Sequence, residues 1–175
     1  MSTKAKGGKA FIVVGATGMG KTTWLKNMLR TVHPENLFLY DVNAEYTELY
    51  NAPLPDFDKF SDEAKHKRES VIVFEEATIF LNNRGSNVSL IDVLVRKRHT
   101  KNIVFLVFHS FRAVPKYIID LCNYMVIHKT NDTVDLVARY KNDTITKAFS
   151  EILAAPMIVA ENGSEYSPSK IISLN

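Results

Sequence analysis

The sequence feature that most constrains the fold is an apolar run that leads directly into a glycine-rich loop. The run is Phe11–Val14, and the loop Gly15–Thr22 follows the pattern G-x-x-x-x-G-K-T. Apolar residues with helical spacing follow over Lys21–Val32. Glycines let the backbone N–H groups of such a loop surround a polyphosphate, and the following helix directs its positive end at the anion. The pattern therefore predicts a phosphate-binding loop between a buried strand and a helix.

The side chains of this loop are suited to a nucleoside triphosphate and a magnesium ion. Lys21 supplies a mobile cation for the outer phosphates, and the Thr22 hydroxyl is a magnesium ligand. We therefore expect ATP and Mg²⁺ to bind here. The alternative is a glycine-rich turn with a chance lysine. The residues expected to contact the nucleotide form one stretch: Gly15, Ala16, Thr17, Gly18, Met19, Gly20, Lys21, Thr22 and Thr23.

Apolar runs alternate with helical patterns along the rest of the chain, which predicts an α/β fold. Parallel strands joined by right-handed crossovers bring ligand groups to their carboxyl ends. We expect the three-layer sandwich of a P-loop NTPase, RecA/ASCE-like, with a mainly parallel central sheet. The expected strands are Lys9–Val14, Leu37–Tyr40, Val71–Phe74, Ile103–Phe108 and Tyr124–Ile127. The expected helices are Lys21–Val32, Asp58–Arg68 (exposed), Val88–His99 and Pro115–Leu121.

The length of 175 residues fits one α/β domain. We expect a flexible basic arm over residues 1–8 and a single P-loop domain over 9–175, with a core at 9–128 and a C-terminal extension at 129–175. In the extension, Thr133–Tyr140 reads as a strand and Asp143–Leu153 as a helix. Glu161–Ser164 reads as a turn between two closing strands.

Composition excludes several classes of protein. The single cysteine, Cys122, excludes an internal disulfide and a cysteine-rich zinc site. No apolar stretch approaches the ~20 residues of a membrane span, and the N-terminus lacks an apolar signal core. We therefore expect a cytoplasmic protein with no membrane partner. A net charge of +3 is too small to indicate a nucleic-acid partner by itself.

Two adjacent carboxylates follow the third apolar strand. Val71–Phe74 runs directly into Glu75 and Glu76. In a P-loop ATPase, a strand beside the first carries an acid for the magnesium shell, and a neighbouring acid orients or deprotonates the attacking water. We assign Glu75 to magnesium and Glu76 to water. The alternative is a helix N-terminus with two favourable negative charges.

Four segments in the expected order resemble the FtsK–HerA superfamily of ring-forming, DNA-pumping ATPases. They are the loop Gly15–Thr22, then Asp41–Tyr46, which is similar to the D-P-x-G-E-Y segment of HerA-like proteins, then Val71–Glu76, and finally Phe108–Pro115 with Cys122–Ile127 beyond. The resemblance spans about residues 9–128.

The resemblance implies sensing roles for polar residues at two strand ends. His109 and Ser110 stand where the family usually has Gln or Thr, so one of them is implied to sense the γ-phosphate. A similar polar role is implied for Asn43 or Glu45. Glu75 replaces the usual Asp, which leaves its capacity to hold a metal intact.

The small size is most similar to the genome-packaging ATPases of bacterial and archaeal viruses. In those of small tailed phages, an R-x-R pair precedes strand four, and its first arginine reaches into the next subunit's active site. Arg96-Lys97-Arg98 occupies that place. The resemblance therefore implies Arg96 as an arginine finger acting in trans, with Arg98 and Arg84 as second and third candidates. The alternative is that these arginines face solvent or contact a phosphate backbone.

The function implied by the resemblance is an ATP-hydrolysing motor that moves double-stranded DNA during viral genome packaging. Its implied partners are further copies in a pentameric or hexameric ring, DNA bound without sequence preference, and a capsid or portal component. DNA is expected to stimulate hydrolysis. A Zot-like filamentous-phage assembly ATPase, a small nucleotide kinase and a noncatalytic nucleotide switch are the alternatives. The expected catalytic residues are Glu76, Lys21, Arg96, Arg98, His109 and Ser110.

Overall fold

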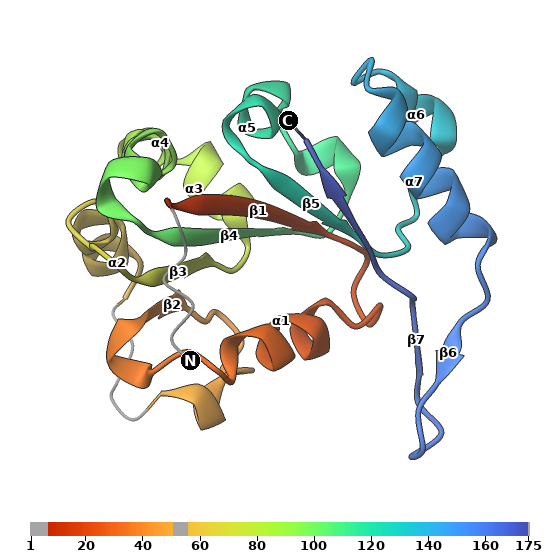
Figure 1. Ribbon diagram of the computed structural model, residues 1–175, viewed down its shortest axis with the longest axis horizontal. Helices are drawn as coiled ribbons and strands as arrows, with labels where there is room; N and C mark the ends of the chain where they lie inside the picture. Colours follow the sequence, from red (N-terminus) through yellow and green to blue (C-terminus); the bar gives the residue numbers. More distant parts are fainter. Residues whose placement is uncertain (1–6, 51–55, 175) are drawn as a thin grey trace.

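The structure, a computed structural model, describes residues 7–50 and 56–174. Its main sheet has six strands in the order β2-β3-β4-β1-β5-β8 (Figure 1). The first five are parallel to one another, and β8 runs antiparallel to β5. The strands are β1 (Lys9–Val14), β2 (Leu37–Tyr40), β3 (Val71–Phe74), β4 (Ile103–Phe108), β5 (Tyr124–Ile127) and β8 (Lys170–Ser173).

Helices cover both faces of this sheet, which confirms the predicted three-layer α/β sandwich. On one face, Leu25 and Leu29 of α1 (Lys21–Leu29) pack against Val13 of β1. Alternate residues of the same strand, Ile12 and Val14, face the larger cluster on the other side. The elements on that side are α2 (Phe57–Ala64), α3 (Ala77–Asn82), α4 (Arg84–Thr100), α5 (Lys116–Leu121), α6 (Val134–Ala138) and α7 (Asp143–Ala154).

Short elements connect these layers. Three 3₁₀ turns lie at η1 (Pro34–Asn36), η2 (Thr47–Leu49) and η3 (Phe111–Ala113). A separate two-stranded hairpin, β6 (Ile158–Val159) and β7 (Glu165–Tyr166), extends from the body of the molecule below α7 in Figure 1. None of the helices formed by residues 7–50 and 56–174 combines the length and apolar character of a membrane span.

The five predicted strands have the predicted bounds, whereas several helices differ. α1 ends at Leu29 instead of Val32, because a turn leads from there to His33 and the following proline. α4 begins at Arg84 instead of Val88, because the Asn83 side chain caps its first N–H groups. α3 was not expected.

The other differences concern exposure and the C-terminal extension. α2 is not fully exposed, since Phe60 and Ala64 are buried against the sheet. The expected strand Thr133–Tyr140 is instead the helix α6, whose first turn is capped by the Thr133 side chain. The predicted turn Glu161–Ser164 does connect two strands, β6 and β7. Of the expected arm 1–8, residues 1–6 lie outside the described residues, and Gly8 is buried.

Candidate functional site

The glycine-rich loop leaves the carboxyl end of β1 and is held by both neighbouring strands. Gly15 N–H donates to the Phe108 carbonyl at the end of β4 (3.1 Å), and Ala16 N–H donates to the Lys129 carbonyl just beyond β5 (2.8 Å). Gly18 and Gly20 have φ angles of 78° and 89°, a left-handed conformation that favours glycine. The loop is thus a fixed turn at the middle of the sheet's carboxyl edge.

The loop opens directly into the first turn of α1. Gly20 precedes this helix and provides no side-chain cap, so the N–H groups of the first turn have no partner within the helix. Lys21 lies in this turn, is buried, and donates from Nζ to the Ala16 carbonyl (3.0 Å). Burial lowers the pKa of Lys21, and the carboxylates of Glu76, Glu45 and Glu75 oppose that shift. N–H groups without intrahelical partners and a nearby ammonium suit this turn to an anion.

His109, at the end of β4, connects Lys21 with Glu76. Its Nδ1 lies 3.4 Å from Lys21 Nζ, and its Nε2 is in close contact with Glu76 Oε1. Because an ammonium can only donate, the geometry fits a neutral imidazole that accepts from Lys21 and donates from Nε2 to Glu76. Ser110, the next residue, directly precedes η3, and its carbonyl accepts the Ala113 N–H. The structure therefore brings His109, not Ser110, to Lys21 and Glu76.

Glu76 has a left-handed backbone conformation, with φ at 56°, between β3 and α3. A helix does begin after it, as the alternative interpretation of the acid pair required, but its side chain makes no capping hydrogen bond. The carboxylate is directed to His109 instead. Glu76 is therefore available for chemistry at the loop.

The segment after β2 supplies another acid to the same place. The Asp41 carboxylate accepts the backbone N–H groups of Glu45 and Tyr46, each at 2.9 Å, and the Tyr50 hydroxyl at 3.1 Å. This folds the segment so that Glu45 Oε2 accepts a hydrogen bond from the Thr22 hydroxyl (3.0 Å). Both residues that were given a polar role there are exposed, and it is Glu45 that the structure brings to the loop.

Glu75 is only 4% exposed, and its Oε2 has no hydrogen-bond partner among the described residues. Burial, together with the carboxylates of Glu45 and Asp41, raises its pKa to about 8. Carboxylate and hydroxyl oxygens suit Mg²⁺, which commonly keeps several waters and binds phosphate as well. In the described residues no group of three or more His, Cys, Asp or Glu is placed to hold a metal alone. Thr22 and Glu75 therefore have oxygen atoms that would suit a magnesium ion, and phosphate and water would supply its remaining ligands.

The candidate finger arginines lie away from this cluster. Arg96 and Arg98 are exposed near the end of α4, and Arg96 pairs with Asp92 (3.1 Å). The carbonyl of Lys97, which lies between them, packs on Gly8 just before β1. This is the amino-terminal end of the strand, whereas the loop follows its carboxyl end. The Lys97 side chain is buried, and its Nζ donates to two carbonyls at 3.0 and 2.8 Å. Arg84 is exposed at the start of α4.

Sequence reasoning missed His128, which follows β5 directly. It is 2% exposed and packs beneath the loop, where a Cβ added to Gly15 would lie 2.6 Å from the His128 Cβ. Burial, with a contribution from the Lys21 charge, lowers the pKa of His128 to about 4. The signal was available, since a polar residue at the carboxyl end of a strand beside β1 belongs at the ligand edge.

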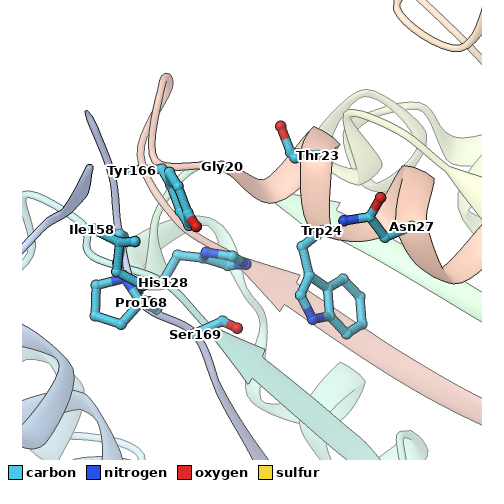
Figure 2. Close-up of a pocket in the computed structure, with 10 residues that line it drawn as sticks. Gly20, Thr23, Trp24, Asn27, His128, Ile158, Tyr166, Pro168 and Ser169 are labelled. Atoms are coloured by element: carbon cyan, nitrogen blue, oxygen red, sulfur yellow. Dashed lines mark hydrogen bonds between the residues drawn. The ribbon is translucent and has the colours of Figure 1, made fainter. Parts of the chain in front are cut away.

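Sequence reasoning also missed a pocket of about 160 Å³ beside the loop, between α1 and the segment that follows the β6–β7 hairpin (Figure 2). Thr23, the last residue of the predicted nucleotide-binding stretch, lines it. The C-terminal segment carries no motif that places it there. The other residues that line the pocket are Gly20, Trp24, Asn27, His128, Ile158, Tyr166, Ser167, Pro168 and Ser169.

Comparison with known proteins places the fold. No model of a known protein family and no curated protein matches the sequence. Among solved structures, the chain is similar to the genome-packaging NTPase B204 of Sulfolobus turreted icosahedral virus 2 in complex with AMPPCP. The TM-score is 0.68 and the sequence identity 15%, over 93% of this chain and 96% of that one.

Two further structures agree. The DNA-packaging ATPase B204 of Sulfolobus turreted icosahedral virus gives a TM-score of 0.68 at 15% identity over the same shares of the two chains. B204 in complex with ATP-gammaS gives 0.66 at 15% identity, over 93% of this chain and 95% of that one. These likenesses show that the chain has the same fold as the packaging NTPase B204, an α/β fold of the predicted class.

Proposed function

We propose that this protein is an ATP-hydrolysing motor that translocates double-stranded DNA during viral genome packaging. The observation that carries the proposal is the convergence of Lys21, Thr22, Glu75 and Glu76 on one phosphate-binding loop. The fold shared with B204, a packaging NTPase solved with ATP analogues, supports the choice among P-loop enzymes.

The chain's own residues divide the work of hydrolysis. The loop N–H groups and the Lys21 ammonium hold the outer phosphates, and Glu76 takes a proton from the attacking water. The new bond forms between that water oxygen and the γ-phosphorus, while the bond to the oxygen bridging the β- and γ-phosphates breaks. Magnesium held by Thr22 and Glu75 would neutralise phosphate charge. His109 contacts both Lys21 and Glu76, so it can couple occupation by the γ-phosphate to the position of the base.

The placement of the arginines supports the proposal of a ring. Arg96 and Arg98 lie at the sheet edge opposite their own loop, so a finger role requires the loop of another subunit. Head-to-tail contact in a closed ring supplies such a loop to every subunit. A planar guanidinium placed on the developing phosphate charge contributes about 10³–10⁵ in rate. The partners that we propose are DNA and a capsid or portal component, and the proposed location is the host cytoplasm.

The primary test measures ATP turnover against protein concentration, with and without double-stranded DNA. We expect turnover per subunit to rise with concentration as rings assemble, and to rise again with DNA. Glu76→Gln should lower turnover by about 10²–10⁴-fold while ATP binding persists. Turnover independent of both concentration and DNA would contradict the motor. Transfer of phosphate to a nucleotide acceptor would favour the kinase alternative.

The trans arrangement has its own test, which uses mixed rings. Subunits with both Arg96→Ala and Arg98→Ala, and subunits with Glu76→Gln, should each be nearly inactive alone. Mixing them creates interfaces at which an intact Glu76 meets an intact arginine, so part of the activity should return. Arg30→Ala, an exposed arginine at the end of α1, is the matched control and should leave turnover unchanged. Mixtures that stay as inactive as the separate variants would exclude a finger acting in trans.

A further inference from the structure

The pocket lies so close to the loop that one ligand could occupy both. Gly20, the last glycine of the loop, and Thr23 on the first turn of α1 form one wall, so the pocket adjoins the anion site. Its volume of about 160 Å³ is below the ~300–1,000 Å³ of pockets that enclose a whole drug-sized ligand. The size suits one part of a larger molecule whose remainder lies on the loop.

The walls of the pocket offer aromatic and apolar surface from both ends of the chain. Trp24 of α1 packs edge-on against Phe105 and lines the pocket. Across the pocket, Ile158 and Tyr166 are register partners in the hairpin, so they lie on one face of it. Both remain partly exposed, at 40% and 37%. Figure 2 shows the His128 imidazole between the Tyr166 side and the Trp24 side.

A buried polar group is directed at this pocket. His128 lines it and is 2% exposed, and neither ring nitrogen makes a hydrogen bond of full geometry among the described residues, although the Met19 and Ser167 backbone interacts weakly with the ring. Buried polar nitrogens are rarely left unpaired, because their desolvation is then uncompensated. A neutral imidazole both donates and accepts, which suits a partner with hydroxyl or ring-nitrogen groups.

The hairpin side of the pocket is tied to the phosphate-binding loop. Ser167 N–H donates to the Met19 carbonyl (3.3 Å), and the Ser167 hydroxyl accepts the Lys129 N–H (2.8 Å). A Cβ on Gly20 would lie 3.2 Å from the Tyr166 Cβ, so the hairpin packs closely on the loop. The segment 158–169 is thereby held as a wall of the same site.

We propose that this pocket binds the nucleoside part of the triphosphate, with the base against Trp24 and Tyr166 and a hydroxyl or ring nitrogen on His128. This assigns a role to the C-terminal extension, and it rests on the proposed function, since the phosphates must occupy the loop. Aromatic stacking recognises any base, because every base has a π face.

The test separates the nucleoside from the phosphates by comparing ATP with inorganic tripolyphosphate. Binding of each, with Mg²⁺, is measured by calorimetry, and Trp24, the only tryptophan in the sequence, reports stacking by its fluorescence. We expect ATP and AMP to change that fluorescence and tripolyphosphate not to. Tyr166→Ala should lower the affinity for ATP by about 5- to 100-fold, which is the effect expected from losing one base–aromatic stacking contact. The same variant should leave tripolyphosphate binding unchanged.

The controls keep the outcomes distinct. Tyr117→Ala, a similarly exposed tyrosine on α5, should alter neither ligand. Trp24→Leu, with its folding checked by thermal melting, provides a second change in the opposite wall. If ATP and tripolyphosphate bind equally well, or if Tyr166→Ala weakens the binding of both alike, the pocket does not hold the nucleoside. The proposed phosphate site is unaffected by that result. If neither ligand binds, the proposed function itself is wrong, and the role of the pocket falls with it.

Discussion

The buried histidine beneath the loop should make the stability of the protein depend on pH in a defined way. In an unfolded chain a histidine takes up its proton near pH 6.5. In the folded protein, burial and the Lys21 charge lower the pKa of His128 to about 4. Between these values the unfolded state binds one proton more than the folded state. The free energy of unfolding therefore falls as the pH is lowered.

The magnitude follows from the two pKa values. One pKa unit corresponds to about 1.4 kcal/mol, so the stabilising contribution present above pH 6.5 amounts to about 3 kcal/mol and is lost by about pH 4. By pH 5, about 2 kcal/mol of it should be gone. This is a large fraction of the roughly 5–15 kcal/mol that stabilises a typical domain.

Urea unfolding of the wild type and of His128→Gln, each at a series of pH values from 7.5 to 5, measures this contribution. Glutamine stays neutral throughout, so whatever its substitution costs at neutral pH is constant. Glu75, whose raised pKa has the opposite effect on stability, is present in both proteins and cancels in the comparison. The difference between the two proteins should shrink or reverse by about 2 kcal/mol as the pH falls to 5. Parallel curves would refute the assignment of a neutral, buried His128.

Two further predictions concern packing. Gly15→Ala should destabilise the protein by about 1–3 kcal/mol, because the added Cβ would lie 2.6 Å from the Cβ of His128. Gly85→Ala is the control and should not destabilise the protein, since its added Cβ would have its nearest neighbour at 3.7 Å. Equal thermal shifts for the two variants would contradict this prediction. Asn102→Ala should cost about 1–3 kcal/mol, since this buried amide bonds backbone groups on either side of Arg68, near the start of β3. Asn36→Ala, an exposed residue in η1, serves as its control in the same melting experiment.

The central strands were predictable because their signal is strong and local. Strands covered on both faces read as continuous apolar runs, and Val71–Phe74 and Ile103–Phe108 are of this kind. Short helices carry no such signal. α6 has five residues, and its position depends on tertiary packing, with Val137 buried and the nearby Tyr140 hydroxyl bonded to the Phe111 and Val114 carbonyls.

The site divides in the same way. The loop and the acid pair were identifiable because each is a continuous pattern with a fixed chemical role. The hydrogen bond from Thr22 to Glu45 was not, because it depends on how Asp41 folds the segment after β2. The pocket was least predictable, since Trp24 and Tyr166 lie about 140 residues apart and line one pocket only because the extension returns along β5.

The strand order predicts one orientation for the nucleotide that we propose to bind here. β1 lies between β4 and β5, and each of these two neighbouring strands is followed by a histidine. The loop therefore lies between His109 and His128. His109, on the β4 side, meets the acid proposed to activate water, whereas His128, on the β5 side, is buried, neutral and directed at the pocket. From the two proposals we expect the γ-phosphate to lie toward β3 and β4, and the nucleoside toward β5 and β8. A nucleotide found in the reverse direction would separate Glu76 from the bond to be broken, so a structure with a bound ATP analogue tests both proposals at once.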